Sequence, residues 1–573
     1  MLFKMLKSLW FSRAKAADAN ITLLLDEIEQ LAAAGDLAGA LRKCQDVPPS
    51  SSNHPEILVM EGGLLGRLER YDEAAELLNR ALSIDSCHRQ GLFYLGNIAL
   101  VKGRYDEAVT LFARAAAAGP IDATLLANHG RALMGAGRLE EAKQVLEEAL
   151  AITPDCMVAI EPLCQILVEQ QCFDEAIGFL DVLIGAQPGN GRLVRLKGFI
   201  LYKRFYQPRE ADRLFDQAEG LGEEEAQFWK ERGECAHDLG DDLRALHYYD
   251  RALAILPQDP VVTFNKAILG LMHEEYATAW VGYEARFEGS TLGKLQLPAP
   301  RWEGGRLDGA NLVVIGEQGI GDEIMFASCL QDLPKDGQVT LTCTGKLQEI
   351  FQASFPQIRC VARHEPLQLA PDKPAYAIAA GSLPGYFRTS RESFPRRLYL
   401  VAPAQARIAV APFLAGLPAG LKVGLSWRGG TEASRSRLRS IPLDAFADLL
   451  KIPGVTWVSL QYGDCAVDLD ALQAISGCQL HADSAILADY AQTAALVEGL
   501  DLVVTVCTAI VHLAGALGKE VWVLAPKVPE WRYGLGFRFM PWYRQVEVLR
   551  QPERGDWSTL LDTVRRRLLD QAQ

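Results

Sequence analysis

The sequence reads Arg70-Tyr71-Asp72-Glu73-Ala74 at one place and Arg104-Tyr105-Asp106-Glu107-Ala108, a near copy, 34 residues later. The alanine that ends each copy belongs to a longer series with spacings of 34 or 35 residues. The members of the series are Ala40, Ala74, Ala108, Ala142, Ala176, Ala211, Ala245 and Ala279. A fixed period of this length is typical of a repeated supersecondary unit that packs mainly on its neighbours. The first half of the chain is therefore predicted to be a helical solenoid.

Other small residues accompany the alanine series at fixed offsets. Glycine precedes four of the alanines by twelve residues, at Gly62, Gly96, Gly130 and Gly233, and proline follows four of them by twelve, at Pro120, Pro154, Pro188 and Pro257. Small residues let two helices approach closely, and proline ends the second helix. The pattern resembles the tetratricopeptide repeat over residues 20–288, or about eight repeats. Arg286 stands where a small residue is expected, as befits a terminal repeat.

Length and composition limit the classes of protein that fit. The 573 residues are too many for one hydrophobic core, so two or three domains are expected. A net charge of −14 argues against nucleic acid as the main partner. The twelve cysteines lack metal-ligand spacing, so we expect reduced thiols in a cytoplasmic protein, without a metal or a resident cofactor.

The first 19 residues form a segment of their own, in which apolar residues alternate with Lys4, Lys7, Arg13 and Lys15. Because Lys7 interrupts the apolar stretch, the segment does not resemble a secretory signal. It is expected to be either a disordered leader or an amphipathic helix with weak contact to a membrane surface. No apolar stretch approaches the length of a transmembrane helix.

The pattern changes after Phe287. A linker is expected over residues 289–309, followed by short apolar runs that alternate with helical stretches. Strands are predicted at residues 312–315, 339–343, 376–380, 421–426, 456–461, 502–506 and 521–524, with a helix at residues 323–333 among others. Such alternation predicts parallel α/β structure. We expect two Rossmann-like lobes, residues 310–417 and 418–573, the second closed by a C-terminal helix and both facing a ligand cleft.

Three loops carry the candidate functional residues. The first, residues 316–322, has the glycines Gly319 and Gly321 at the start of a helix, where backbone and helix N-terminus favour an anion. Asp322 either caps that helix or takes part in chemistry. The second loop follows a strand ending at Ser426 and holds four arginines, Arg428, Arg435, Arg437 and Arg439. It either binds phosphate or is a solvated loop.

The third loop begins after the strand that ends at Val506. Thr508 precedes a helix of small residues, whose first backbone N–H groups could bind an anion. His512 lies one turn inside and either packs or contacts a ligand. Together, the three loops resemble the ADP-heptosyltransferase family, glycosyltransferase family 9, over about residues 310–550. With the repeats in front, the chain is similar to bacterial tetratricopeptide-repeat glycosyltransferases, including flagellin glycosyltransferases.

The resemblance implies the two-lobed GT-B fold and a role for each matching residue. Asp322 would be the catalytic base. The donor, a nucleotide-sugar, would be bound by Gly319, Gly321, Ser426, Arg428, Arg439, Gln461, Thr508 and His512. Two positions depart from the family pattern: Cys507 replaces an aspartate, and Ala509 replaces a glycine. A carboxylate that would orient the donor or an arginine is therefore missing at position 507.

The expected function is an inverting transfer of a sugar to a hydroxyl of a protein acceptor, flagellin or another surface protein, held in the groove of the repeats. Asp322 would accept the hydroxyl proton, and arginines would take the place of a metal. Asp468 and Asp470 form an Asp-x-Asp pair, but they fall in a predicted amphipathic helix, which disfavours a metal site. The alternatives are a non-catalytic repeat adaptor with a degenerate transferase domain and a transferase acting on lipopolysaccharide.

Overall fold

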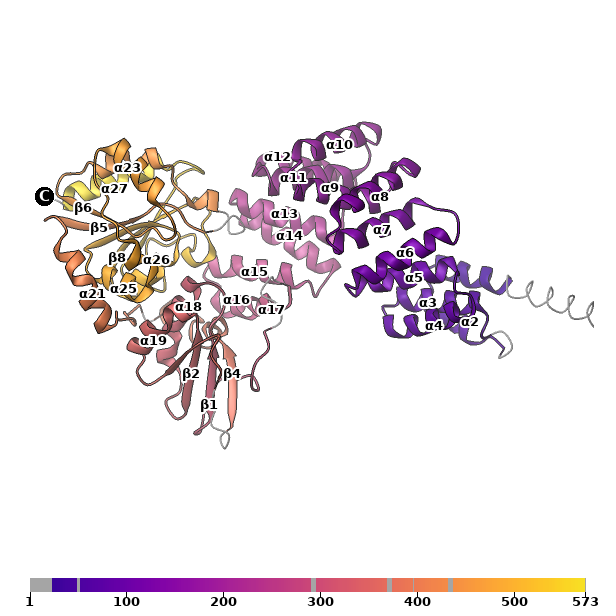
Figure 1. Ribbon diagram of the computed structural model, residues 1–573, viewed down its shortest axis with the longest axis horizontal. Coiled ribbons are helices and arrows are strands. Elements are labelled where there is room, and N and C mark those ends of the chain that lie inside the picture. The colour runs from indigo at the N-terminus through magenta and orange to yellow at the C-terminus, as the bar shows by residue number, and fades with distance from the viewer. Residues whose placement is uncertain are drawn as a thin grey trace, which may run out of the picture. The chain divides into compact units, whose positions relative to one another are not determined.

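A computed structural model describes residues 23–48, 52–289, 295–367, 374–394, 396–430 and 436–571 (Figure 1). The chain divides into two compact units, with the division between Glu223 and Glu224. The predicted leader at residues 1–19, residues 290–294 of the predicted linker, Arg435 and the side chain of Arg437 lie outside the described residues. Within the described ranges, no helix is both long enough and apolar enough to cross a membrane.

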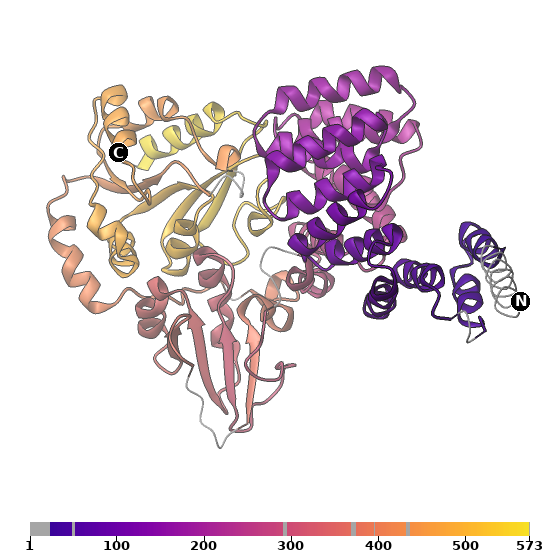
Figure 2. The ribbon, with the colours of Figure 1, turned by 45° about the vertical axis from the view of Figure 1, so that its right-hand side comes forward.

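The first unit is built from helices joined by short turns, and successive helices pack in pairs (Figure 2). They are a helix at residues 23–33, α2 (Leu37–Gln45), α3 (Pro55–Arg67), α4 (Tyr71–Ile84), α5 (Arg89–Val101), α6 (Tyr105–Ala117), α7 (Ala123–Gly135), α8 (Leu139–Ile152), α9 (Met157–Glu169), α10 (Phe173–Ala186), α11 (Gly191–Lys203) and α12 (Pro208–Gly220). The predicted helical solenoid is confirmed.

The small residues of the repeat pattern lie where helices touch. Ala74, Ala108 and Ala142 are fully buried. A side chain at Gly62 would lie 2.7 Å from Leu78 Cγ, and one at Gly130 would lie 2.6 Å from Leu146 Cγ. Contacts that close exclude even a methyl group without displacement of the partner helix. The periodic small residues therefore set the spacing of helices within each pair.

The second unit begins with further helix pairs, α13 (Ala226–Leu239) with α14 (Asp242–Ile255) and α15 (Pro260–Met272) with α16 (Tyr276–Tyr283), and then the short α17 (Arg286–Gly289). The sequence predicts a boundary at residue 288, whereas the compact units divide at Glu223. The physical reason is a shared core, because Trp280 and Tyr283 are buried in one cluster with residues of the first sheet. The last helix pair is therefore packed as part of the α/β region.

The first sheet is parallel, with strand order β3-β2-β1-β4. Its elements are β1 (Asn311–Ile315), α18 (Ile320–Ala327), β2 (Gln338–Cys343), α19 (Gln348–Ser354), β3 (Arg359–Ala362), β4 (Ala375–Ala379) and α20 (Pro384–Phe387). Strand β3 was not predicted. The predicted helix at residues 323–333 is wrong at both ends, because a cap at Gly319 starts α18 earlier and a 3-10 helix takes over at Ser328.

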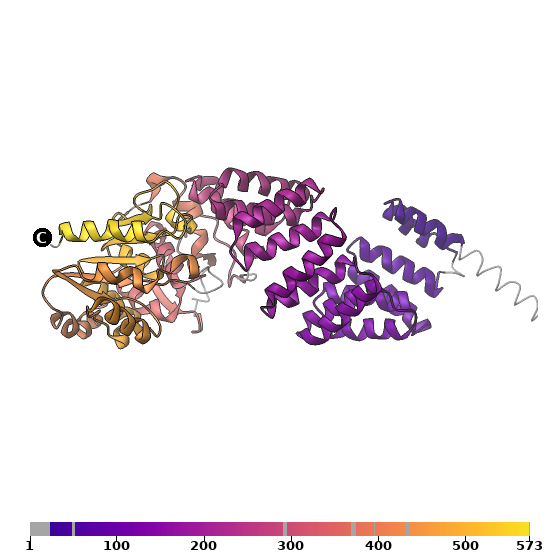
Figure 3. The same cartoon turned by 90° about the horizontal axis from the view of Figure 1, so that it is seen from above.

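The second sheet is also parallel, with strand order β6-β5-β7-β8-β9. Its strands are β5 (Leu421–Ser426), β6 (Val455–Ser459), β7 (Leu502–Val506), β8 (Glu520–Ala525) and β9 (Val546–Arg550), the last of which was not predicted. The helices are α21 (Ala404–Ala415), α22 (Ala447–Leu450), α23 (Ala466–Ser476), α24 (Ser484–Ala488), α25 (Tyr490–Glu498), α26 (Ala509–Ala516) and α27 (Ser558–Gln571). Figure 3 shows α27 lying along this sheet, and its Val564 is buried in one cluster with Trp522 of β8.

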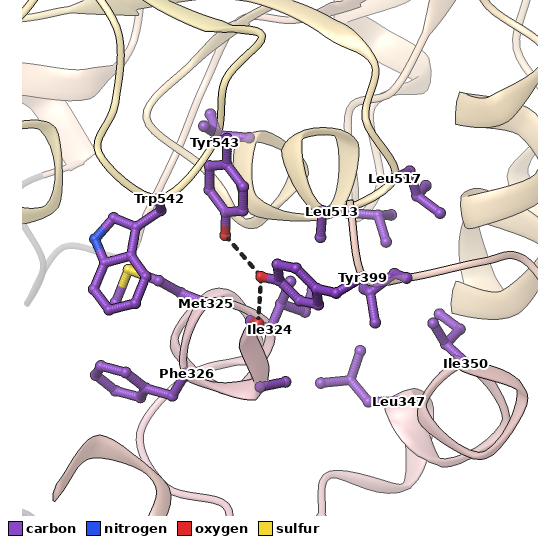
Figure 4. Packing of buried hydrophobic residues seen from close by; sticks show 14 of the residues in the cluster. Ile324, Met325, Phe326, Leu347, Ile350, Tyr399, Leu513, Leu517, Trp542 and Tyr543 are labelled. Atoms are coloured by element: carbon purple, nitrogen blue, oxygen red, sulfur yellow. Dashed lines mark hydrogen bonds between the residues drawn. The ribbon is translucent and has the colours of Figure 1, made fainter. Parts of the chain in front are cut away.

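Helix α18 of the first sheet and helix α26 of the second sheet pack together in one apolar cluster (Figure 4). A short hydrogen-bonded chain crosses it: the Tyr399 hydroxyl donates to the Ile324 carbonyl at 2.8 Å and lies 3.4 Å from the Tyr543 hydroxyl. Leu513 of α26 belongs to the same cluster. These contacts fix the two helices that carry the first and third candidate loops.

Candidate functional site

The three predicted loops follow strands at the places where strand order reverses. In the first sheet β1 lies between β2 and β4 and leads into the Gly319 loop. In the second sheet β5 and β7 are neighbours and lead into the loops of Arg428 and Thr508. Doubly wound sheets bind ligands at these switch points, beyond the carboxyl ends of the strands. The topology thus puts all three loops at positions favoured for a ligand.

The first and third loops touch where α18 crosses α26. A side chain at Gly321 would lie 3.0 Å from His512 Cδ2 and 3.4 Å from Ala509 Cα. A side chain there would require His512 or the start of α26 to shift by a few tenths of an ångström. Gly321 therefore serves close helix packing, and Gly319 is the N-cap residue of α18.

Asp322 lies in the first turn of α18 and has two partners. Its Oδ2 accepts a hydrogen bond from the Gly319 N–H at 3.3 Å, so that the N3 carboxylate caps the N-cap backbone of α18. Its Oδ1 accepts from Arg532 Nε at 2.7 Å and also from Arg532 Nη2. The side chain of Asp322 is 13% exposed and that of Arg532 is 16% exposed. The predicted base is thus held as a carboxylate in an ion pair that retains some contact with solvent.

The ion pair continues into the arginine loop. Arg532 Nη1 lies 3.4 Å from Glu530 Oε2, and Glu530 Oε1 lies 2.6 Å from Arg439 Nη1. We call Asp322, Arg532, Glu530 and Arg439 the ionic chain. Burial alone would lower the pKa of Arg532, but Asp322 and then Glu530 outweigh burial, and the pKa is raised. Two predicted site residues, Asp322 and Arg439, are therefore linked through two residues that the sequence did not single out.

Glu530 and Arg532 follow β8, and Arg532 lies in a one-turn 3-10 helix at Trp531–Tyr533. The neighbouring Trp531 ring packs edge-on against Trp280 and Tyr283 of α16, with centroids 5.8 and 5.6 Å away. The sequence signal that could have identified Glu530 and Arg532 is that two residues of opposite charge follow the predicted strand at residues 521–524. Without a motif at that position, only the fold reveals that this loop meets the other three.

His512 is buried, and its Nδ1 lies 3.1 Å from the Tyr543 hydroxyl. Burial, with Arg532 as a further cause, lowers the pKa of His512 to about 3. The imidazole is therefore neutral near pH 7, and it packs between the rings of Tyr533 and Tyr543, with centroids 6.2 and 5.8 Å away. Thr508 caps α26 by accepting the Ile510 N–H at 3.3 Å, and its hydroxyl lies 3.2 Å from that of Thr505.

Gln461 holds the second loop in place. Its Oε1 accepts the N–H groups of Trp427 at 3.1 Å and Arg428 at 3.0 Å, and also the Ser426 hydroxyl at 3.2 Å. Gln461 and Ser426 are both buried. The structure therefore gives these two predicted donor-binding residues internal partners, while the Arg428 side chain is 43% exposed.

Asp468 supports the same loop. Its Oδ2 accepts from Trp427 Nε1 at 3.0 Å and lies 3.3 Å from Arg428 Nε. The Arg428 Nη2 donates to the Asp464 carbonyl at 2.6 Å. Asp468 thus orients an arginine, and the described residues contain no group of three or more His, Cys, Asp or Glu side chains that could hold a metal ion.

The second and third loops are also in contact. A side chain at Gly429 would lie 2.8 Å from the Cys507 carbonyl oxygen and 2.9 Å from Thr508 Cγ2. Burial raises the pKa of the Cys507 thiol, and the nearby Glu530 carboxylate raises it further. Glu530 therefore lies near Cys507.

Helix pairs at a 34-residue period followed by two parallel sheets define a tetratricopeptide-repeat protein with a C-terminal α/β region. Comparison with family models agrees, because two tetratricopeptide-repeat models match the chain, one at residues 59–123 and 199–260 and the other at residues 99–159 and 133–198. The chain is 30% identical to Protein FlbA of Caulobacter vibrioides over 441 residues, which is 73% of each protein. The chain belongs to the FlbA family.

Solved structures with similarity to the chain include a tetratricopeptide repeat protein from Parabacteroides merdae, with 16% identity and a TM-score of 0.38 over 42% of this chain and 96% of that one. PilF of Pseudomonas aeruginosa shows 19% identity and a TM-score of 0.29, over 36% of this chain and 92% of that one. The similarity to both is limited to part of the chain.

Proposed function

We propose that the protein is a glycosyltransferase of GT-B type that moves a sugar from a nucleotide-sugar to a hydroxyl of a protein acceptor in the cytoplasm. The observation that carries the proposal is the ionic chain, which brings together the predicted base Asp322 and the predicted phosphate ligand Arg439. Their loops belong to different sheets, and both sheets have doubly wound strand orders. Glu530 would supply the carboxylate that Cys507 cannot.

In the proposed reaction the acceptor oxygen attacks the anomeric carbon while Asp322 accepts the hydroxyl proton. The new carbon–oxygen bond forms as the bond from the anomeric carbon to the donor phosphate breaks, and the phosphate leaves with the electron pair. Attack from the opposite side inverts the configuration. Arg428 and Arg439 would stabilise the leaving phosphate, so that the step needs no metal.

The acceptor would be held by the repeats, since stacked repeats present an extended surface suited to a protein segment. Fusion of the repeats to the transferase raises the concentration of the bound segment at the site. The resemblance noted above favours flagellin or another surface protein as the acceptor.

The proposal is tested by the intact mass of candidate acceptor proteins from cells with the wild-type chain, cells without it, and cells with the Asp322→Asn variant. We expect a mass increase of one or more sugar residues in cells with the wild-type chain, and no increase in cells without it or with the Asp322→Asn variant. The matched control is Glu323→Gln, which removes a negative charge from the next residue and should preserve the modification. An unmodified acceptor pool in the presence of folded wild-type protein would contradict the proposal.

A second candidate is a non-catalytic adaptor that binds a client protein through its repeats. One observation favours it: both oxygens of Asp322 already have partners, so the carboxylate acts as a structural group in this state. The two functions differ in ligand binding. A transferase should bind at least one of UDP, ADP, GDP and CMP, whereas an adaptor should bind none of them.

A further inference from the structure

Arg532 lies between two carboxylates of the ionic chain. It contacts Asp322 through Nε and Nη2 and Glu530 through Nη1. The backbone that follows Arg532 is held in place, because Arg550 donates to the carbonyls of Tyr533 at 2.5 Å and Phe537 at 2.6 Å. Trp531 is fixed against α16. The position of the residue is therefore set, while the guanidinium reaches a partly exposed site.

We propose that Arg532 is a donor-phosphate ligand that exchanges partners, leaving Asp322 for the phosphates when the donor binds. The inference rests on the proposed function and adds to it a phosphate ligand and an order of events. Planar guanidinium groups bind carboxylate and phosphate with the same fork of donors, so one can replace the other. Asp322 would thereby lose its ion-pair partner and become available to the acceptor hydroxyl.

Charge supports the exchange. The ionic chain holds two arginines and two carboxylates, so its formal charge is balanced without a ligand. A bound phosphate adds negative charge next to Arg439 and Arg532, and the Arg532 guanidinium would pair with the phosphate in place of Asp322. The Asp322 carboxylate would then lack its ion-pair partner, and the proton it accepts from the acceptor hydroxyl would neutralise it during the reaction. Acceptor activation would therefore follow donor binding.

The test is a double-mutant cycle on the full chain, with the affinity for inorganic pyrophosphate and for UDP, ADP, GDP and CMP measured by calorimetry. The variants are Asp322→Asn, Arg532→Gln and the combination of both. If Asp322 competes with phosphate for Arg532, Asp322→Asn should tighten binding about tenfold, as expected for a released charge-assisted pair. In the Arg532→Gln background the same substitution should give no gain.

The cycle separates exchange from simple repulsion. Loss of a negative charge that merely repels phosphate would tighten binding with or without Arg532. Glu323→Gln is the matched control, because Glu323 pairs with Arg363 rather than with the ionic chain, and it should change affinity less than Asp322→Asn. Should Asp322→Asn fail to fold, Asp322→Ser takes its place in the cycle, because it removes the same carboxylate partner of Arg532.

The outcomes distinguish the two proposals. Binding by the wild type that Asp322→Asn leaves unchanged or weakens would overturn the exchange and leave the transferase proposal standing. An equal gain in both backgrounds would likewise overturn the exchange. Absence of binding by the wild type and all variants would overturn the exchange together with the proposed function.

Discussion

Two arginine–carboxylate pairs in the second unit differ in how they are enclosed. Arg286 is fully buried, donates to Glu317 at 3.0 and 2.7 Å and also contacts Ser382 and Glu284. Glu317 in turn accepts the Gly381 N–H at 2.9 Å. The Asp322–Arg532 pair retains solvent contact and ends on a second arginine–carboxylate pair. The Arg286–Glu317 pair joins α17 to the first sheet. The Asp322–Arg532 pair lies among the candidate ligand-binding loops and keeps some contact with solvent.

The comparison shows that an arginine–carboxylate pair can serve structure or ligand binding, depending on its burial and on the hydrogen bonds around it. A sealed pair with extra hydrogen bonds is costly to open, because either partner alone would be a buried, unpaired charge. A pair with solvent access can exchange a partner for a ligand of the same charge. The predictions below test this contrast.

The largest effect is expected for Arg286→Met, which leaves Glu317 buried without its partner. Loss of one member of a buried pair costs about 3–5 kcal/mol of unfolding free energy. The measurement is the urea unfolding transition of the second unit, followed by tryptophan fluorescence. Arg306→Met is the control, because the Arg306–Asp308 pair is largely exposed and its loss should leave the transition in place. Equal effects of the two variants would remove the contrast.

Gly321→Val tests the crossing of α18 and α26. The added side chain would meet His512 and the backbone of Ala509, and overpacking of this kind costs about 1–3 kcal/mol. Gly319→Ala, where the nearest atom to the added methyl is Asp322 Oδ2 at 3.4 Å, should have a much smaller effect on unfolding. A Gly321→Val protein with wild-type stability would show that the helices do not cross as closely as described.

Asp322→Asn should separate stability from activity. Asparagine keeps an oxygen that can accept the Gly319 N–H, and Arg532 keeps Glu530 as a partner, so we expect a loss of only about 1–2 kcal/mol. Sugar transfer should be lost, because an amide cannot accept the proton. If unfolding of this variant shifts as far as that of Arg286→Met, the Asp322 pair is structural, and its proposed exchange is wrong.

The last prediction concerns the pH dependence of unfolding, an effect that is small near neutral pH and grows as the pH falls. The unfolded chain protonates His512 near pH 6.5, but the folded protein holds its pKa at about 3, so stability due to the neutral imidazole is full above pH 6.5 and is lost as pH falls toward 3. The contribution to the slope is at most about 1.4 kcal/mol per pH unit. His512→Gln should flatten the dependence of unfolding free energy on pH between 6.5 and 3. An unchanged slope would contradict burial of a neutral His512.

The sequence predicted the parts of the fold that repeat or alternate. The small residues at a period of 34 predicted the helix pairs, and apolar runs predicted seven of the nine strands that the described residues form. Strand β3 was missed because Arg359–Ala362 is only four residues long and begins with a charged one. The predicted boundary at residue 288 ignored contacts of Trp280 and Tyr283 that are distant in sequence.

The candidate site was predicted in its loops but not in its connections. Asp322 and Arg439 were predicted from local patterns, but the residues that link them, Glu530 and Arg532, were not. Arg532 lies 210 residues after Asp322 in the sequence. Long-range ion pairs leave no local signal in a single sequence. Gln461 and Ser426 were predicted to bind the donor, and their internal hydrogen bonds to the second loop became visible only with the fold.

The central claim is that Arg532 serves the donor phosphate and Asp322 in turn. The most direct measurement is a crystal structure of the protein with a bound nucleoside diphosphate from the panel above. The account predicts that the Arg532 guanidinium hydrogen-bonds a phosphate oxygen and that Asp322 Oδ1 has lost it. A bound nucleotide with Arg532 still on Asp322 would contradict the claim.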